Sequence, residues 1–226
     1  MRILAVDTTS FYGSVALLDN MILQAEINII SPMTHSERLL PAIRFILQSQ
    51  GLEIKDMDGF AVAAGPGSFT GIRIGLSTVK SFSYASQKPV AAVSGLKALA
   101  LKIKMPHSRL LCPFIDAKKG EVYTSLFESR KNKLKEIVPQ NVYTPDRFLS
   151  LLPRHRIISF IGTGVAPYKK KILEYFPDKA RFSPRSLFIA HEVGLLGQEI
   201  IHQKKAVDFH RLKPLYFRKS QAEDKD

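Results

Sequence analysis

The chain repeats its own pattern, and this repeat restricts the choice of fold more than any other feature. Residues 6–17 read as an apolar strand that ends in Asp7, followed by a short polar turn and an alternating strand. Residues 115–126 have the same layout. The segments 60–67 and 157–164 form a second matching pair, in which an apolar strand runs into Gly-x-Gly. Because both pairs occur in the same order, the chain is predicted to fold as two units built on one plan.

Each unit is predicted to contain a β-hairpin, a helix, a strand, a glycine-rich turn and a second helix. Buried strands that alternate with helices are typical of α/β layers. The polar, proline-containing stretch 104–108 separates the two halves. We therefore expect an N-terminal domain over residues 1–104 and a C-terminal domain over residues 105–226.

Composition excludes several classes of protein. The single cysteine, Cys112, excludes a disulfide framework and a multi-cysteine metal site, and its apolar neighbours predict a small buried side chain. Asp7 interrupts the N-terminal apolar run too early for a signal peptide. No stretch approaches the length of a membrane span. We therefore expect a soluble, cytoplasmic protein without a membrane partner.

The net charge of +13 is unevenly distributed. Residues 1–96 hold seven Lys/Arg and seven Asp/Glu, whereas residues 97–226 hold 26 Lys/Arg and 13 Asp/Glu. A basic second half can attract a polyanion such as tRNA. The alternative is an ordinary solvated surface in a lysine-rich proteome, since no RNA-binding module with interleaved aromatic residues is visible.

Two kinds of turn are candidates for phosphate binding. A turn that follows a strand-end aspartate can surround a phosphate with backbone N–H groups and hydroxyls, although such an aspartate can also simply cap the turn. Glycine-rich turns before helices can hold an anion or can allow close packing. The turn at 65–71 matches neither the Walker A nor the Rossmann pattern. The candidate phosphate-binding residues are Asp7, Thr8, Thr9, Asp116, Lys118, Gly162, Thr163 and Gly164.

Two helices of the first half are candidates for a partner interface. The first is predicted to begin at Thr34, where Glu37 completes a capping box, and Pro41 predicts a kink or a new start. The second is predicted over residues 71–87. Both have a broader apolar and small surface than a one-sided surface helix needs, which indicates either a buried helix pair or, as we favour, a partner surface. The candidate interface residues are His35, Leu39, Ala42, Ile43, Phe45, Ile46, Phe69, Thr70, Gly71, Arg73, Ile74, Gly75 and Thr78, with Gly75 expected where a partner backbone comes close.

Neither a metal site nor a catalytic triad is predicted. A helical metal site at His35 would need a second histidine four residues later, and that position is Leu39. The spacing of the turn at 65–69 does not fit a nucleophile elbow.

Taken together, Asp7-Thr8-Thr9, the segments 35–41, 65–75 and 116–123, and the tail 214–218 resemble the TsaB (YeaZ-type) family of the bacterial tRNA threonylcarbamoyladenosine (t6A) machinery. The resemblance covers nearly the whole chain, and GPGSFTGIRIG at 65–75 is its most specific part. It implies an α/β fold of two duplicated actin/hexokinase-like (ASKHA, ribonuclease H-like) domains.

The resemblance also implies a function. Members are expected to be non-catalytic scaffold subunits that bind and activate TsaD, the catalytic subunit, which modifies the adenosine next to the anticodon of tRNA. TsaD carries a metal-binding His-x-x-x-His pair where this chain has His35 and Leu39. The two apolar helices are expected to pair with TsaD, or with themselves in a homodimer when TsaD is absent.

Further partners and cofactors follow from the same resemblance. TsaE is expected to join in a nucleotide-dependent way, and tRNA is reached through the complex. No cofactor is expected to be required, although the candidate phosphate-binding residues predict a vestigial site with weak ATP or ADP binding in the complex. The alternative is an active kinase or peptidase of the same fold. Thr9 replaces a glycine usual in the kinase phosphate loop, and no nucleophile–base pair is visible for a peptidase.

Overall fold

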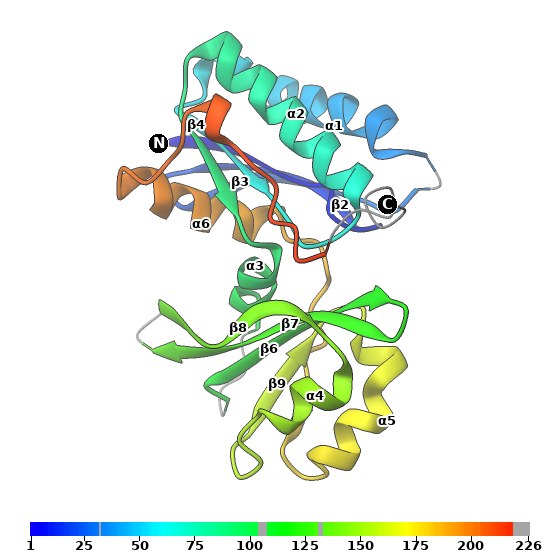
Figure 1. The fold of residues 1–226 in the computed structure, drawn as a ribbon. Coiled ribbons are helices and arrows are strands. Elements are labelled where there is room, and N and C mark those ends of the chain that lie inside the picture. The colour runs from blue at the N-terminus through cyan, green and yellow to red at the C-terminus, as the bar shows by residue number, and fades with distance from the viewer. Residues whose placement is uncertain (32, 104–107, 131–132, 219–226) are drawn as a thin grey trace. The chain divides into compact units, whose positions relative to one another are not determined.

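The computed structural model describes residues 1–31, 33–103, 108–130 and 133–218. These residues divide into two compact units, each with its own five-stranded sheet (Figure 1). Unit 1 comprises residues 1–95 and 188–216, and unit 2 comprises residues 96–187 and the tail from Phe217. No helix within the described ranges is long and apolar enough to cross a bilayer.

Unit 1 has the strand order β3-β2-β1-β4-β5. The strand β1 pairs antiparallel with β2 and parallel with β4. Its elements are β1 (Arg2–Asp7), β2 (Gly13–Asp19), β3 (Ile22–Ile29), α1 (His35–Ser49), η1 (Ile54–Asp56), β4 (Gly59–Ala63), α2 (Phe69–Ser86), β5 (Val90–Val93), α6 (Ala190–His202) and η2 (Phe209–Arg211).

Unit 2 repeats this topology. Its strand order is β8-β7-β6-β9-β10, and β6 pairs antiparallel with β7 and parallel with β9. The predicted α/β duplication of hairpin, helix, strand, glycine turn and helix is therefore confirmed. Its elements are α3 (Gly95–Leu101, which begins on the last residue before the unit), β6 (Leu110–Lys118), β7 (Glu121–Arg130), β8 (Lys133–Tyr143), α4 (Pro145–Ser150), β9 (Ile158–Ile161), α5 (Val165–Tyr175) and β10 (Ala180–Phe182).

The two helices predicted in the first half are present. The helix α1 begins after Thr34, whose backbone N–H donates to Glu37 Oε2 at 2.7 Å, so the capping box is confirmed. It continues through Pro41 without a new start. The helix α2 ends at Ser86, and its C-cap Gln87 adopts the left-handed conformation at φ 54°.

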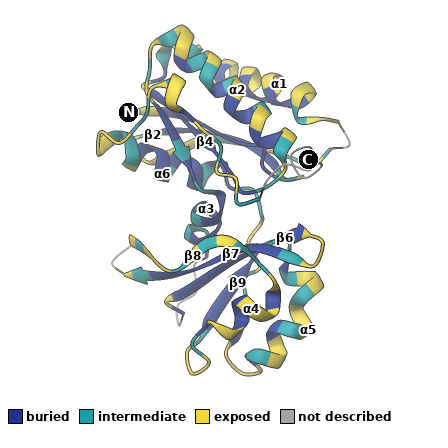
Figure 2. Ribbon diagram, in the orientation of Figure 1, coloured by how far each residue is buried: buried dark blue, intermediate teal, exposed yellow. Residues whose placement is uncertain are grey.

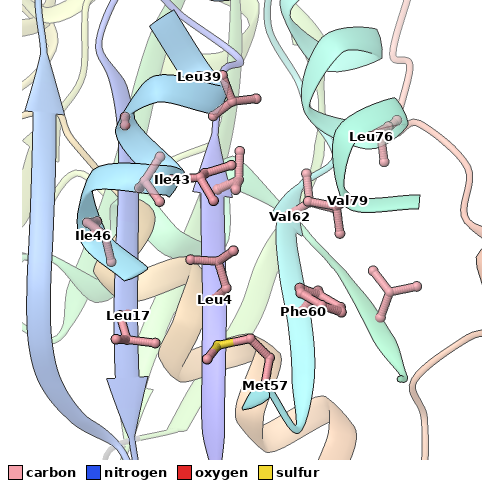
Figure 3. Close-up of a cluster of buried hydrophobic side chains, with 14 of the residues drawn as sticks. Leu4, Leu17, Leu39, Ile43, Ile46, Met57, Phe60, Val62, Leu76 and Val79 are labelled. Carbon is pink, nitrogen blue, oxygen red and sulfur yellow. The ribbon is translucent and has the colours of Figure 1, made fainter. Parts of the chain in front are cut away.

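Strands β1, β2, β4 and β5 of the unit 1 sheet are buried on both faces. Alternate strand residues, such as Leu4, Leu17 and Val62, form a core with the inner sides of α1 and α2 (Figure 3). The helix α6 packs against β1, β2, β4 and β5. Its approach is close because Gly194 and Gly197 lie against strand side chains: a Cβ at Gly197 would stand 2.3 Å from Ala61 Cβ.

The units do not divide at the predicted position. The stretch 104–107 lies outside the described residues, and unit 1 ends at Gly95 and takes up residues 188–216 again. The physical reason is the need to cover the second face of the unit 1 sheet, which α6 does. The pattern Gly194-x-x-Gly197 in an apolar helix was the available signal for this close packing.

Unit 2 has a separate core, rich in phenylalanine. Cys112 is fully buried in it, as predicted, with Sγ 3.6 Å from Thr124 Oγ1. Burial raises the pKa of the Cys112 thiol, which keeps the thiol protonated and unreactive.

Candidate functional site

The first strand-end aspartate is enclosed within its own turn. Asp7 Oδ1 accepts hydrogen bonds from the Thr9 backbone N–H at 2.9 Å and from Thr9 Oγ1 at 2.7 Å. Burial raises the pKa of Asp7 to about 6, and the Thr9 hydrogen bonds oppose that shift. Both Thr9 donors that could reach a phosphate are therefore engaged by Asp7.

The second strand-end aspartate has the same local geometry. Asp116 Oδ1 accepts from the Lys118 backbone N–H at 2.8 Å, and Asp116 Oδ2 lies 2.8 Å from Lys118 Nζ. Burial acts to raise the pKa of Asp116, but the hydrogen bonds and charge of Lys118 outweigh it and hold that pKa below its usual range. The predicted equivalence of the two turns is thus visible in their hydrogen bonds.

The glycine turns pack against the ends of the first strands. A Cβ at Gly67 would stand 2.1 Å from the Thr9 carbonyl oxygen, and one at Gly71 would stand 2.0 Å from the Thr8 carbonyl oxygen. In unit 2, the Gly164 backbone N–H donates to the Phe114 carbonyl at 2.9 Å.

Gly162 and Thr163 complete the same arrangement in unit 2. Gly162, at φ 130°, lies against the Phe114 carbonyl, and the Asp116 backbone N–H donates to Thr163 Oγ1 at 3.1 Å. These contacts fit the capping and packing interpretation of both turns. Nucleotide binding at these residues stays a prediction.

His35 is held by contacts inside unit 1. Its Nε2 lies 2.8 Å from the Ser10 carbonyl oxygen, and its Nδ1 lies 3.0 Å from an Arg38 guanidinium nitrogen. The Nδ1 must accept and the Nε2 must donate, because Arg38 is only a donor and a carbonyl is only an acceptor. Burial and the Arg38 charge lower the pKa of His35, which favours the neutral ring. Nε2 therefore fixes the start of α1 against the β1–β2 turn, and Nδ1 is occupied by Arg38 of the same helix.

Arg38 completes this contact, and the sequence analysis missed it. It is buried and also donates to the carbonyls of Phe11 at 3.2 Å and Ser31 at 3.3 Å. Its sequence signal was a charged residue within the apolar stripe of α1.

The inner side of the helix pair belongs to the core. Ile46 is 1% exposed, and Leu39, Ile43 and Ile46 point toward the strands in Figure 3. A Cβ at Gly75 would stand 2.5 Å from Thr8 Oγ1, and Thr8 Oγ1 donates to the Gly71 carbonyl at 2.7 Å. The expected close approach of a partner at Gly75 is therefore corrected to a close approach within unit 1. The candidate interface residues whose side chains or backbone are buried in this way are Leu39, Ala42, Ile43, Ile46, Gly71 and Gly75.

The outer side of the helix pair is largely exposed (Figure 2). Phe45 is 66% exposed, and Leu40, which the sequence analysis did not select, is 53% exposed. A groove of about 590 Å³ is lined mainly by Leu40, Ile43, Leu47, Leu52 and Phe82, and Phe45 is not one of its lining residues. The candidates that are exposed or half-buried are His35, Phe45, Phe69, Thr70, Arg73, Ile74 and Thr78.

Residues 215–216 contact the start of α2 and the end of the strand before it. Leu215 donates its backbone N–H to the Ala64 carbonyl at 2.7 Å. The Tyr216 ring stacks on Phe69 with centroids 4.2 Å apart, and Arg73 Nε donates to Tyr216 Oη at 3.2 Å. Phe69 and Arg73 therefore hold this segment, a role that sequence reasoning did not assign to them.

The comparisons with known proteins agree on a family. A model described as TsaD, tRNA N6-adenosine threonylcarbamoyltransferase, matches residues 29–225. The tRNA threonylcarbamoyladenosine biosynthesis protein TsaB of Bacillus subtilis is 34% identical over all of this chain and 97% of its own length. TsaB of Haemophilus influenzae is 29% identical over 96% of this chain and 94% of its own.

Solved structures support the same assignment. YeaZ from Pseudomonas aeruginosa superposes with a TM-score of 0.82 at 28% identity, covering 95% of this chain and 99% of that one. A ROK hexokinase from Thermus thermophilus, at 10% identity and a TM-score of 0.53 over 90% of this chain and all of that one, shares the fold alone. On this sequence and structural similarity, the chain belongs to the TsaB family of tRNA threonylcarbamoyladenosine biosynthesis proteins.

Proposed function

We propose that this chain is a non-catalytic subunit that binds and activates a TsaD-type threonylcarbamoyltransferase in t6A biosynthesis. The observation that carries the proposal is the state of His35, at the position where the family resemblance implies the first metal-binding histidine of TsaD. Its two ring nitrogens are hydrogen-bonded to Ser10 and Arg38, and Leu39 four residues later is buried and supplies no ligand atom. These residues do not fit a metal, and we derive no catalytic step through one.

The remaining polar groups support the same proposal. The Asp7 and Asp116 carboxylates are hydrogen-bonded within their own turns, and the Cys112 thiol is buried with a raised pKa. An active kinase needs an accessible catalytic carboxylate, and a peptidase needs a nucleophile beside a base. Neither alternative is favoured by a specific contact in the described residues. We therefore propose that no cofactor is required, with ATP or ADP bound weakly, if at all, in the complex.

The catalytic part of the proposal has a direct test. Purified protein supplied with threonylcarbamoyl-adenylate and tRNA is expected to give no modified adenosine, and addition of TsaD is expected to give it. Mass spectrometry of the digested tRNA measures the product. Robust modification by this chain alone overturns the proposal.

We place the partner surface on the outer side of α1 and α2. Phe45 and Leu40 are large, apolar and exposed, and Leu40 lines the groove together with Leu47, Leu52 and Phe82. Large exposed apolar side chains and an apolar groove are typical of a partner interface. On this proposal TsaD covers the surface in the heterodimer and a second copy covers it when TsaD is absent. TsaE joins the complex in a nucleotide-dependent way. The complex binds tRNA, and the modification takes place in the cytoplasm.

The interface test uses two exposed side chains from different units. Phe45→Ala is expected to weaken TsaD binding by about 2 kcal/mol or more, which is roughly 30-fold, because it removes an apolar anchor. Leu151→Ala, whose side chain is 53% exposed in unit 2, is the matched control and is expected to leave binding unchanged. Isothermal titration measures the affinity, and thermal unfolding checks that both variants are folded. Equal affinities for the two variants would show that the outer side of α1 is not the interface.

A further inference from the structure

The two units differ sharply in charge although they share one topology. Unit 1 holds 11 Lys/Arg and 10 Asp/Glu, whereas unit 2 holds 22 Lys/Arg and 10 Asp/Glu. Nearly all of the net charge of +13 therefore belongs to unit 2. A lysine-rich proteome would enrich both units alike, so unit 1 serves as an internal control. The excess in unit 2 needs a local explanation.

Ion pairs neutralise several of the cations on the hairpin side of unit 2. Lys118 pairs with Asp116 at 2.8 Å, Arg130 pairs with Glu128 at 2.8 Å, and Arg218 pairs with Glu121. The exposed lysines of this side that have no ion pair among the described residues, Lys119, Lys133 and Lys135, also form no cation–π contact there.

The outer side of α4 and α5 is different. These helices pack side by side in unit 2 (Figure 1), and Lys171 pairs with Asp146 across them at 2.5 Å. Arg154, Lys169 and Lys170 are exposed, and in the described part of the chain no carboxylate lies within ion-pair distance of them. We call these three residues, with Lys171, the α4–α5 surface.

Aromatic rings hold two of these cations. Lys169 Nζ lies 5.2 Å from the centroid of the Phe182 ring, and Arg154 Cζ lies 5.4 Å from that of Tyr175. Both rings are only half-buried. A cation held over an aromatic face loses little freedom when it binds an anion. The surface thus combines unpaired positive charge with aromatic contacts, which is the composition that RNA backbones bind.

We infer that the α4–α5 surface directly binds the phosphate backbone of the RNA that the complex modifies. This inference rests on the proposed function, since it identifies the bound polyanion as the tRNA substrate of that complex. The contact is with phosphates rather than base edges, because the side chains are exposed lysines of α5 and an arginine from the loop after α4 rather than residues in a shaped pocket. Unit 2 then positions tRNA while the α1–α2 face of unit 1 holds the protein partner.

The test removes the three unpaired charges without reversing them. The variant Arg154→Gln/Lys169→Gln/Lys170→Gln, in complex with TsaD, is titrated with a labelled tRNA transcript over a range of KCl concentrations. Binding is expected to weaken about 10-fold or more near 0.1 M salt, and the slope of log affinity against log salt is expected to fall by about 2 to 3, because each phosphate contact contributes roughly 0.7 to 0.9.

A matched control separates this surface from general charge. Lys119→Gln/Lys133→Gln/Lys135→Gln removes the same charge from exposed lysines at the hairpin ends of unit 2 and is expected to leave the slope nearly unchanged. Equal slopes for wild type and the α4–α5 variant, or an equal loss in the control, overturn the inference. Size-exclusion mass first establishes that the complex forms. If the wild-type protein does not bind TsaD, the proposed function fails. The same tRNA titration is then run on the full chain without TsaD, and the comparison of its salt slopes still tests the inference.

Discussion

Unit 1 and unit 2 have the same strand order and the same hairpin geometry, but their surfaces differ. Unit 1 is nearly neutral and exposes large apolar side chains on α1, whereas unit 2 carries almost all of the net positive charge. The difference shows that duplication preserved the sheet and its turns while the outer helices diverged. A protein partner suits the first surface, and a polyanion suits the second.

The largest expected difference between the units comes from adding one methyl group to a glycine turn of each. In Gly67→Ala the new Cβ would stand 2.1 Å from the Thr9 carbonyl, and in Gly164→Ala it would stand 2.9 Å from the Phe114 carbonyl. We expect the free energy of unfolding to fall by about 4 kcal/mol or more for Gly67→Ala and by about 1 to 2 kcal/mol for Gly164→Ala. Urea denaturation of the full chain measures both. Equal losses would show that the two turns are packed equally tightly.

A second comparison contrasts neighbours on α1. Ile46→Ala removes a side chain from the core and is expected to lower the free energy of unfolding by about 3 kcal/mol. Phe45→Ala, on the outer side, is expected to change it by less than about 0.5 kcal/mol. Thermal and urea unfolding distinguish them. A large loss for Phe45→Ala would mean that this ring is part of the monomer core and unsuited to a partner surface.

The two strand-end aspartates predict opposite dependence on pH. The pKa of Asp7 is raised to about 6, so its ionisation disfavours folding and stability is lost as the pH rises from about 4 through 6. We expect Asp7→Asn to stabilise the protein by about 2 kcal/mol above pH 6, with the gain disappearing near pH 4. Stability measured at several pH values tests this. A gain that is independent of pH would assign the effect to packing.

Asp116→Asn is the matched control, with the smallest expected effect. The pKa of Asp116 is lowered, so its stabilisation is present above its ordinary pKa and is lost as the pH falls through the folded value. Because Lys118 is largely exposed, we expect a loss below about 1 kcal/mol at neutral pH. A stabilising effect of this variant would contradict the assigned cause of the pKa shift.

Sequence reasoning predicted the repeated elements because their signals are local. The capping box at Thr34, the hairpin after Asp7 and the strand before Gly65 each depend on a few adjacent residues. Which side of a helix meets the core cannot be predicted from adjacent residues alone. Leu39 and Ile46 were assigned to a partner surface because an apolar stripe looks the same whether it faces a sheet or another protein, and only the position of β1 and β2 decides.

Long-range contacts explain what else was missed. Arg38 reaches the carbonyl of Phe11, and the Tyr216 ring reaches Phe69, across separations that no periodicity encodes. The candidate nucleotide residues lie in three turns, after β1, at the end of β6 and after β9, and nucleotide binding by them stays a prediction. Their internal hydrogen bonds, which occupy the Thr9 and Lys118 donors, became visible only with coordinates.

The position of α6 has a consequence for synthesis on the ribosome. The strands of unit 1 emerge early, but the helix that covers their second face emerges only after all of β6–β10. Until then, residues such as Leu18 and Ala61 lack the neighbour against which they pack in the native protein. The nascent first unit must therefore keep an apolar sheet face exposed while the second unit is translated, which makes it a natural client for a chaperone that binds near the tunnel exit.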